Sequence, residues 1–434
     1  MTLPHIDPSV LNSSARGIVE AQGLVACTPP IRSSDYGVCS QAPFYYYLCR
    51  RLGLVKALRY STALNRGSWF HEQFRHSHLA SEDRMIRYYR TLDARTAELR
   101  SVCQQLLISP DGRREILDRE IKDAETAIAW YEAASKVVIS PEWGTFTDFL
   151  SRPYWTILGR EMRLVTHMGR GIAGRLHLVA QPDMLLYHSE QNTVWIVDVK
   201  TTSESPKLRA MSCPIEFQTW HYASIVKSLL DRGMLQRTYD LPSDAMLGGF
   251  IHLIVRKPGI EFGLKDRHYK LDTSELKAGP RKGQPRNEKV YYGEPDLKNY
   301  TQRVTNWYLG QDDYTHLAPQ WIADPPVNCS IISMHTLTRD EIERYQSSLR
   351  VIKQYACIRP EPNLFPLPAS LVAFSRLSDC APFVLNPPNT WGDIIQSEGW
   401  TMTRRDDIPP ETDYDIIREP GSEIINVAEP IESA

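Results

Sequence analysis

The spacing of apolar residues changes along the chain from a helical period to a strand-like one. Residues 62–78 and 81–137 carry apolar side chains every three to four positions, which is typical of helices that bury one face. The second stretch is interrupted at Ser109-Pro110-Asp111-Gly112, so we expect two long helices there. Beyond these helices the apolar runs become short and are separated by glycines or polar turns, which indicates strands. We expect strands at residues 161–166, 175–180, 184–188 and 193–200.

A helix and a further strand follow these four strands. Pro214 is expected to open a helix that runs to about Leu230, because proline is tolerated in a first helical turn. Residues 248–256 then read as another strand, and residues 295–356 read as helical. This order of strands, helix and strand predicts an α/β fold.

The flanking segments differ in composition from this core. Residues 1–34 are expected to form an irregular arm, and residues 386–434 a proline-containing, acidic tail. Residues 261–290 are basic and contain glycine and proline. They would either hold DNA phosphates without reading bases or form a solvated loop, and the sequence leaves both interpretations open. We therefore divide the chain into residues 1–34, 35–260 (with a helical region at 72–140), 261–290, 291–385 and 386–434.

Length, composition and charge are those of an ordinary soluble globular protein. The chain has 434 residues, 42% hydrophobic and 24% charged, and can bury a sizeable core. Its formal net charge of −2 gives no overall attraction to nucleic acid, so a DNA-binding surface would be a local basic patch. The apolar runs are short for a membrane span, no signal peptide is visible, and the eight cysteines lack paired spacing. We expect a protein of the reducing cytoplasm without a membrane partner.

Asp183, Asp198 and Lys200 form a constellation with a chemical use. Asp198 and Lys200 end the apolar run of residues 193–197, and side chains two apart on a strand point to one face. Unpaired buried charge is expensive, so two acids and a lysine around a buried strand favour a functional site over a turn and a surface acid. Carboxylates are ligands for Mg²⁺, and the lysine would activate a water or offset charge in the transition state. These residues predict hydrolysis of a phosphodiester.

Four short motifs occur in a fixed order. They are Gly67-Ser68-Trp69-Phe70-His71, Pro182-Asp183, Asp198-Val199-Lys200 and Gln218-Thr219-Trp220-His221-Tyr222. In this order they resemble the PD-(D/E)XK nucleases, and in particular the RecB-like exonuclease branch of phage and bacterial type. The resemblance covers residues 35–260 and, more loosely, the segment to about residue 385. It implies a restriction-endonuclease-like core, in which a mixed central sheet is flanked by helices and a helical region is inserted.

The resemblance also implies a metal site. Asp183 and Asp198 would hold Mg²⁺ or Mn²⁺, and the backbone carbonyl of Val199 would supply another ligand. His71 would add an imidazole, which suits Mn²⁺ better than Mg²⁺, although an interior hydrogen-bonded histidine is the alternative interpretation. Lys200 would stand beside these ligands, with water activation and charge stabilisation both open as its role.

Four further residues are candidates for, or alternatives at, this site. Gln218 and Tyr222 lie at i and i+4, share one helix face, and by the resemblance would border the site. Glu161 opens the strand before Asp183 and is either an additional acid or an ordinary strand-initial glutamate. His177 stands where RecB-like enzymes often have an acid, and we expect it to be a strand residue.

The cysteines predict no iron–sulfur cluster. Some relatives bind one with an upstream cysteine and three more near the C-terminus. Cys39 and Cys380 match two of these positions, but the chain contains no C-x-x-C pair. Four thiolates normally hold such a cluster, so we expect none here.

Sequence and resemblance together favour a metal-dependent DNA exonuclease in recombination, repair or end processing. The absence of a Walker A motif indicates that the chain has no ATP motor of its own. A recombination (annealing) protein or a helicase is therefore a candidate partner, in a bacterial or phage-infected cytoplasm. The alternatives are a structure- or site-directed endonuclease and a catalytically silent DNA-binding subunit.

Overall fold

A computed structural model of the chain defines its architecture. It describes residues 30–52, 54–56, 58, 61–171, 174–275, 280, 282, 284–286, 288–334, 339–357, 382–383, 386, 394, 400–402 and 415–417. Most of the expected N-terminal arm, Cys380 and most of the expected C-terminal tail lie outside these residues.

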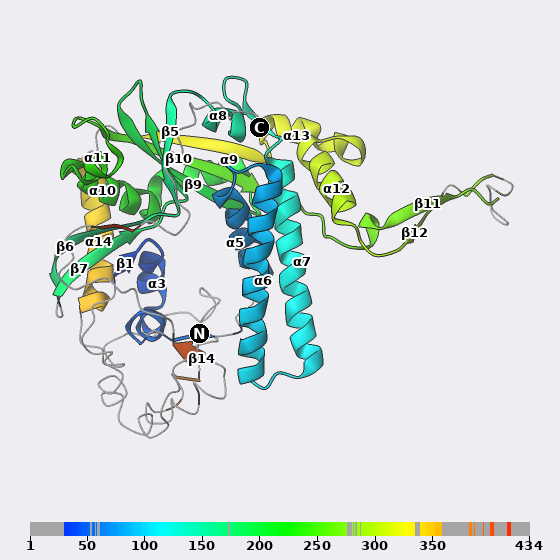
Figure 1. Cartoon of the computed structure of the whole chain (residues 1–434), viewed down its shortest axis with the longest axis horizontal. Helices are drawn as coiled ribbons and strands as arrows, with labels where there is room; N and C mark the ends of the chain where they lie inside the picture. Colours follow the sequence, from blue (N-terminus) through cyan, green and yellow to red (C-terminus); the bar gives the residue numbers. More distant parts are fainter. Residues whose placement is uncertain are drawn as a thin grey trace.

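A five-stranded mixed sheet forms the centre of the molecule (Figure 1). Strands β9 and β10 run parallel, and all other neighbours are antiparallel. The strand order is β13 (Val327–Ser333), β10 (Met246–Arg256), β9 (Thr193–Thr202), β8 (Met184–His188) and β5 (Trp155–Arg160). A second sheet has the order β1 (Ile31–Arg32), β7 (Gly174–Ala180), β6 (Arg163–Gly171) and β15 (Asp415–Ile417).

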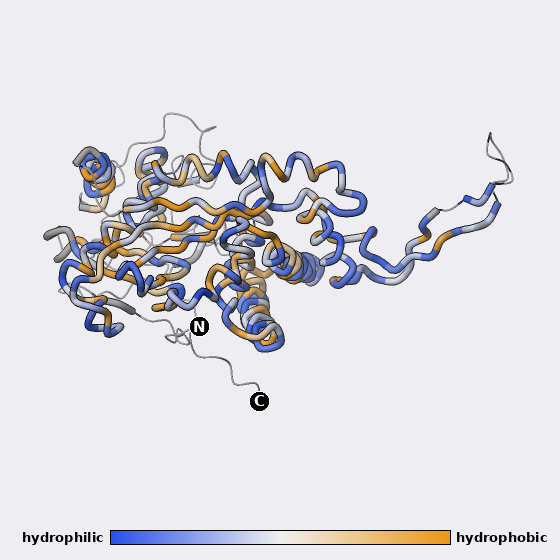
Figure 2. The backbone as a smooth tube through the Cα atoms, turned by 90° about the horizontal axis from the view of Figure 1, so that it is seen from above, coloured by the Kyte–Doolittle hydropathy of each residue, from blue (hydrophilic) through white to orange (hydrophobic). Residues whose placement is uncertain are grey.

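Strand β9 is apolar on both faces because helices cover both. Val194 and Ile196 belong to one hydrophobic cluster, which includes residues of α10 (Phe217–Asp231), α3 (Asp35–Gln41) and α14 (Arg339–Cys357). Trp195 and Val197 belong to a second cluster with α5 (Thr62–Arg75), α7 (Pro110–Ala134) and α12 (Leu297–Leu309). Figure 2 shows hydrophobic residues along these central strands. Because strand side chains alternate, Asp198 and Lys200 lie on the same face as Val194 and Ile196.

The remaining elements surround this core. Helix α6 (Ser81–Gln105) lies beside α7, and the two form a long pair at one side of the sheet (Figure 1). A two-stranded hairpin of β11 (His268–Asp272) and β12 (Glu288–Tyr292) projects from the body. The other elements are α4 (Pro43–Tyr46), η1 (Tyr47–Arg51), β2 (Leu54–Lys56), β3 (Val138–Ser140), β4 (Gly144–Thr145), α8 (Phe146–Leu150), α9 (Pro206–Ser212), η2 (Cys213–Ile215), α11 (Met234–Tyr239), η3 (Leu264–Asp266), η4 (Asp312–Leu317), α13 (Ala318–Ala323) and β14 (Trp400–Met402).

The expected fold class is confirmed: the molecule is α/β, with a mixed sheet flanked by helices. The two long helices broken near Ser109 are α6 and α7. The helix expected from Pro214 begins instead at Phe217, because residues 213–215 form a separate 3₁₀ turn. Strand β13 lies within residues 295–356, which the sequence had predicted to be helical, and β5 was not predicted.

The segment 261–290 is also more ordered than a loop, because its ends pair as β11 and β12. Among the described residues, none of the helices is long and apolar enough to cross a membrane.

Candidate active site

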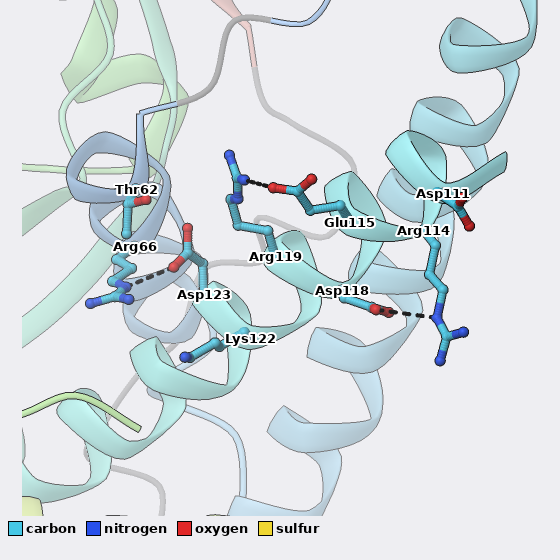
Figure 3. Close-up of a pocket in the computed structure, with 9 residues that line it drawn as sticks. All are labelled: Thr62, Arg66, Asp111, Arg114, Glu115, Asp118, Arg119, Lys122 and Asp123. Carbon is cyan, nitrogen blue, oxygen red and sulfur yellow. Dashed lines mark hydrogen bonds and ion pairs between the residues drawn. The ribbon is translucent and has the colours of Figure 1, made fainter. Parts of the chain in front are cut away.

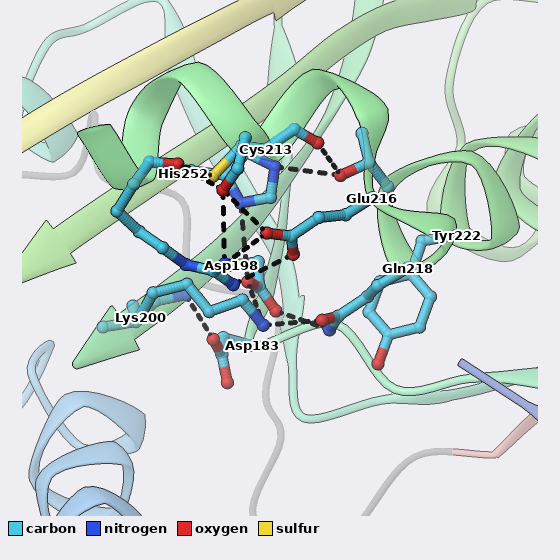
Figure 4. Close-up of polar contacts among 12 residues, drawn as sticks. Asp183, Asp198, Lys200, Cys213, Glu216, Gln218, Tyr222 and His252 are labelled. Atoms are coloured by element: carbon cyan, nitrogen blue, oxygen red, sulfur yellow. Dashed lines mark hydrogen bonds and ion pairs between the residues drawn. The ribbon is translucent and has the colours of Figure 1, made fainter. Parts of the chain in front are cut away.

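Asp198 and Lys200 emerge from the end of β9 and pair with each other (Figure 4). Lys200 Nζ lies 2.8 Å from Asp198 Oδ2. Gln218, from the first turn of α10, joins both side chains: its Nε2 donates to Asp198 Oδ1 at 2.9 Å, and its Oε1 accepts from Lys200 Nζ at 2.6 Å. The structure thus brings together three of the residues expected at the site.

Burial and the ion pair act on these groups in opposite directions. Burial alone would raise the pKa of Asp198, but the Lys200 ammonium and the His252 ring together outweigh burial, and the pKa falls to about 2. Burial likewise acts to lower the pKa of Lys200, but the Asp198 carboxylate outweighs it and the pKa is raised. In this arrangement both groups are charged at neutral pH.

Asp183 connects three elements that are distant in sequence. It lies just before β8 and is only 6% exposed. Its Oδ2 accepts the backbone N–H of Val199 at 2.5 Å, and its Oδ1 lies 2.8 Å from His71 Nδ1. The contact at Val199 uses its amide, so the role of its carbonyl as a metal ligand stays a prediction.

His71 reaches Asp183 because α5 lies close against β9. A Cβ placed on Gly67 would lie 3.1 Å from Thr201 Oγ1 on β9, so glycine permits the approach of the helix. His71 is one turn further along α5. Burial would lower the pKa of His71, but Asp183 outweighs it and raises the pKa to about 9. The ring therefore contacts a carboxylate expected at the site, and its role as a metal ligand stays a prediction.

Glu161 completes a group of potential ligands with His71 and Asp183. Ligand atoms of the three residues all lie within 4.8 Å of one another. Glu161 does not open a strand as expected: it lies in the turn between β5 and β6 with φ of 49°, and its N–H donates to the Asp183 carbonyl at 3.1 Å. Asp198 is not one of these three residues, and its two oxygens contact Lys200 and Gln218.

This donor set fits a divalent cation. Burial raises the pKa of Glu161 to about 8, and the neighbouring Asp183 carboxylate adds to the rise. Carboxylates that disfavour each other's ionisation in a buried place are relieved by a bound cation. Two carboxylates and one imidazole are ligands that Mg²⁺ and Mn²⁺ accept, the imidazole suiting Mn²⁺.

His252 was not singled out from the sequence, although it contacts the site. It is fully buried on β10, directly opposite Asp198 in the parallel ladder. Its Nδ1 lies 3.5 Å from Asp198 Oδ2, and its Nε2 lies 3.2 Å from Thr219 Oγ1. The available signal was a histidine within the apolar run of β10, but the register that places it beside Asp198 is not visible in the sequence.

Tyr222 and Arg160 fix neighbouring segments. Tyr222 shares a helix face with Gln218, but its hydroxyl donates to the Gln181 carbonyl at 3.2 Å and so secures the segment leading to Asp183. Arg160 Nη1 donates to Ser77 Oγ at 2.6 Å and to the carbonyl of Phe74 at 3.1 Å. Arg160 directly precedes Glu161, so these hydrogen bonds connect the end of the helix that carries His71 to the Glu161 turn.

Two other expectations concern residues away from the site. His177 lies buried in β7, opposite His167, as a strand residue and outside the ligand group. Cys39 is buried in α3, and burial raises the pKa of its thiol far above the usual range. The expectation of no iron–sulfur cluster stays a prediction, because Cys380 lies outside the described residues.

A pocket of about 570 Å³ lies between α5 and α7 and is separate from this site (Figure 3). Several of its charged side chains pair with one another: Arg66 Nε lies 2.7 Å from Asp123 Oδ1, and Arg119 pairs with Glu115. None of the ligand-group residues lines it. We therefore take the ligand group and the Asp198–Lys200 pair, and not this pocket, as the candidate active site.

The mixed sheet, the Asp198–Lys200 pair on β9 and the neighbouring acids define a restriction-endonuclease-like protein with a site suited to a divalent cation. The family model of the PD-(D/E)XK nuclease superfamily matches residues 34–306, so the chain belongs to this superfamily of nucleases, whose members are generally metal-dependent. No curated protein and no solved structure matched the chain.

Replacing Glu161 with glutamine tests the ligand group. Without metal at pH 7 we expect Glu161→Gln to raise the free energy of unfolding by about 1 kcal/mol, because glutamine avoids the cost that Glu161 meets on folding, when it must take up a proton or hold a charge beside Asp183. Mn²⁺ at about 100 times its Kd should stabilise the wild type by about 2.7 kcal/mol, and the variant by less at the same concentration. Denaturant unfolding with and without Mn²⁺ measures both effects.

The control is Glu204→Gln, which replaces an exposed glutamate. If Mn²⁺ stabilised Glu161→Gln as much as the wild type, Glu161 would not be a ligand of the cation.

Proposed function

We propose that the protein is a divalent-metal-dependent deoxyribonuclease that hydrolyses phosphodiester bonds. The observation that carries this proposal is the convergence of Asp183, His71 and Glu161 on one side and the Asp198–Lys200 pair on the other, at the end of one strand. Membership of a nuclease superfamily supports the same reaction class.

In this proposal the acids and His71 bind the cation, and Lys200 acts on the water or the phosphate. Asp183 and Asp198 would hold Mg²⁺ or Mn²⁺, with His71 and Glu161 as further ligands. When bound, the cation lowers the pKa of a water and withdraws charge from the phosphate oxygens. Lys200 would lie beside the attacking water or the phosphate, and Gln218 holds it against Asp198. The protein thereby presents a fixed cationic group where negative charge grows during the reaction.

Within this class we propose an exonuclease that processes DNA ends in recombination or repair. The order of the Gly67–His71 and Gln218–Tyr222 motifs supports it, since RecB-like exonucleases share that order. Action in the cytoplasm beside an annealing protein or a helicase belongs to the same proposal. A structure- or site-directed endonuclease, and a silent DNA-binding subunit, are the alternatives.

Cleavage of three DNA forms separates these possibilities. End-labelled linear duplex, single strands and covalently closed circles would be incubated with Mg²⁺, Mn²⁺ or EDTA. We expect metal-dependent loss of linear DNA with circles spared. Cut circles would replace the exonuclease with an endonuclease. DNA binding without cleavage under any metal would leave only the silent subunit.

A further inference from the structure

The β11–β12 hairpin is a long projection with a defined ladder. Five residue pairs run from His268–Tyr292 to Asp272–Glu288, and a further bridge joins Glu275 to Pro285. The distance along the strand from Asp266 to Glu275 is about 30 Å at roughly 3.3 Å per residue. Figures 1 and 2 both show this hairpin extending away from the body of the protein.

The root of the hairpin is fixed to the body. Asp266 is fully buried, and Arg303 on α12 binds it through two nitrogens, each at 2.8 Å. Asn299 Nδ2 and the Asp296 amide both donate to the Asp266 carbonyl at 3.0 Å. Two-pronged arginine–carboxylate pairs are among the stronger and more directional contacts in proteins. The hairpin is therefore held at a set angle to α12.

The same root is linked to the helix that carries His71. Arg66 on α5 donates to both oxygens of Glu261, at 3.0 and 3.1 Å, and Arg303 donates to the Glu261 carbonyl at 2.7 Å. Arg66 lies five positions before His71 on the same helix. The hairpin and the candidate active site thus have a common support, so a ligand that spans both would meet them in a fixed relation.

The hairpin concentrates positive charge on a chain that is slightly acidic. Residues 264–292 contain eight lysines and arginines against four acids, whereas the whole chain has a net charge of −2. The acid at the root, Asp266, is already neutralised by Arg303. Five basic side chains of the described part are exposed: Lys265, Lys270, Lys282, Arg286 and Lys289.

Aromatic residues lie between these charges. Tyr269 and Tyr292 are 50% and 54% exposed, and Lys289 Nζ lies 4.6 Å from the centre of the Tyr269 ring. The ladder puts Tyr269 and Lys289 on one face, and Lys270 and Tyr292 on the other. Leu271 and Val290, 55% and 42% exposed, add one apolar residue to each face, and each face also carries a lysine, so neither face is purely apolar as a protein-binding face would be.

We propose that this hairpin grips duplex DNA along its phosphate backbone, ahead of the segment that enters the active site. A two-stranded β-ribbon fits the major groove of B-form DNA, and lysines and arginines along it would contact phosphates without reading sequence. Its reach corresponds to about nine base pairs at 3.4 Å per step. This inference rests on the proposed DNA substrate and adds to it that the substrate is duplex beyond the site of cleavage.

The test measures DNA binding by the full chain without cleavage, in EDTA, by fluorescence anisotropy. The variant is Lys270→Glu with Lys282→Glu, and the control is Arg90→Glu with Arg100→Glu on the exposed face of α6, which changes the net charge equally. The probes are a duplex of about 30 base pairs and one of about 8, shorter than the reach of the hairpin. Each is titrated from about 50 to 200 mM salt.

We expect the hairpin variant to bind the longer duplex about tenfold or more weakly, with a salt slope lower by about 2, because two phosphate contacts are lost. Binding of the short duplex should change less than about twofold, and the control should match the wild type on both probes. An equal salt slope in variant and wild type on the longer duplex would overturn the inference. The inference would also be overturned if the hairpin variant bound DNA like the wild type but had a different sedimentation coefficient. That result would assign the hairpin to contacts between protein chains.

The outcome is distinguishable from failure of the proposed activity. A wild type that binds DNA through the hairpin but cleaves none of the DNA forms would retain this inference and remove the nuclease proposal. A wild type that cleaves DNA, together with a hairpin variant that binds DNA normally, would retain the nuclease proposal and remove the inference about the hairpin.

Discussion

Asp198→Asn is expected to abolish nearly all metal-dependent cleavage, with a fall in kcat/KM of about 10³-fold or more. Asparagine has almost the same shape and can still accept the hydrogen bond from Gln218 Nε2. It cannot supply the negative charge that holds the cation, and the loss of that interaction costs about 4 kcal/mol in the transition state. The Lys200 ammonium would also lose its 2.8 Å partner.

The matched control for this variant is Asp231→Asn. Asp231 is an exposed aspartate at the end of α10 that pairs with Lys227 at 2.7 Å. Such surface pairs contribute little, so this variant should cleave within about twofold of the wild type. Circular dichroism and thermal unfolding show whether each variant is folded. A folded Asp198→Asn protein that keeps a tenth of the wild-type rate would exclude Asp198 as a required metal ligand.

Lys200→Met is expected to lower kcat by about 10²- to 10³-fold while divalent cations still bind. Methionine keeps most of the side-chain volume and removes the charge. The acids Asp183 and Asp198 would remain, and without the competing ammonium they should hold the cation at least as well. Single-turnover cleavage gives the rate, and the shift of the thermal midpoint with Mn²⁺ reports binding. Lys227→Met, at an exposed lysine, is the control.

Lys200→Arg separates the two roles considered for this lysine. Arginine stays protonated at all working pH values, so it can offset charge but cannot accept a proton from water. Partial recovery of the rate relative to Lys200→Met would assign charge stabilisation. A rate as low as that of Lys200→Met would favour proton transfer, given that arginine also changes the geometry. Loss of the Mn²⁺ shift in Lys200→Met would contradict both roles and make Lys200 a structural residue.

The local part of the site could be predicted from sequence because it depends on short-range periodicity. Asp198 and Lys200 are two apart on one strand, and His71 follows Gly67 by one helical turn. Glu161 was found as a candidate but with the wrong local structure, since a glutamate at positive φ in a turn has no sequence signal of its own. The position of His252 depends on the register of two strands that are distant in sequence.

The missed strands have a related explanation. Residues of β13 are mostly half-buried or exposed, so the strand has no continuous apolar run and forms only because β10 offers an edge. Strand β11 is exposed along both faces, with basic, acidic and aromatic residues interspersed, and lacks the alternation that marks a half-buried strand. Long-range pairing, and not local preference, determines both.

The pairing of β13 with β10 shows that the family match ends before the folding unit does. The matched region stops at residue 306, whereas β13 covers the edge of β10, and Tyr345 on α14 contacts His221 Nδ1 at 3.0 Å beneath the motif helix α10. A recombinant fragment cut at the family boundary would leave an apolar strand with unpaired amides, a template for aggregation. We therefore expect a fragment that folds without an exposed edge of β10 to extend at least through β13 and α14.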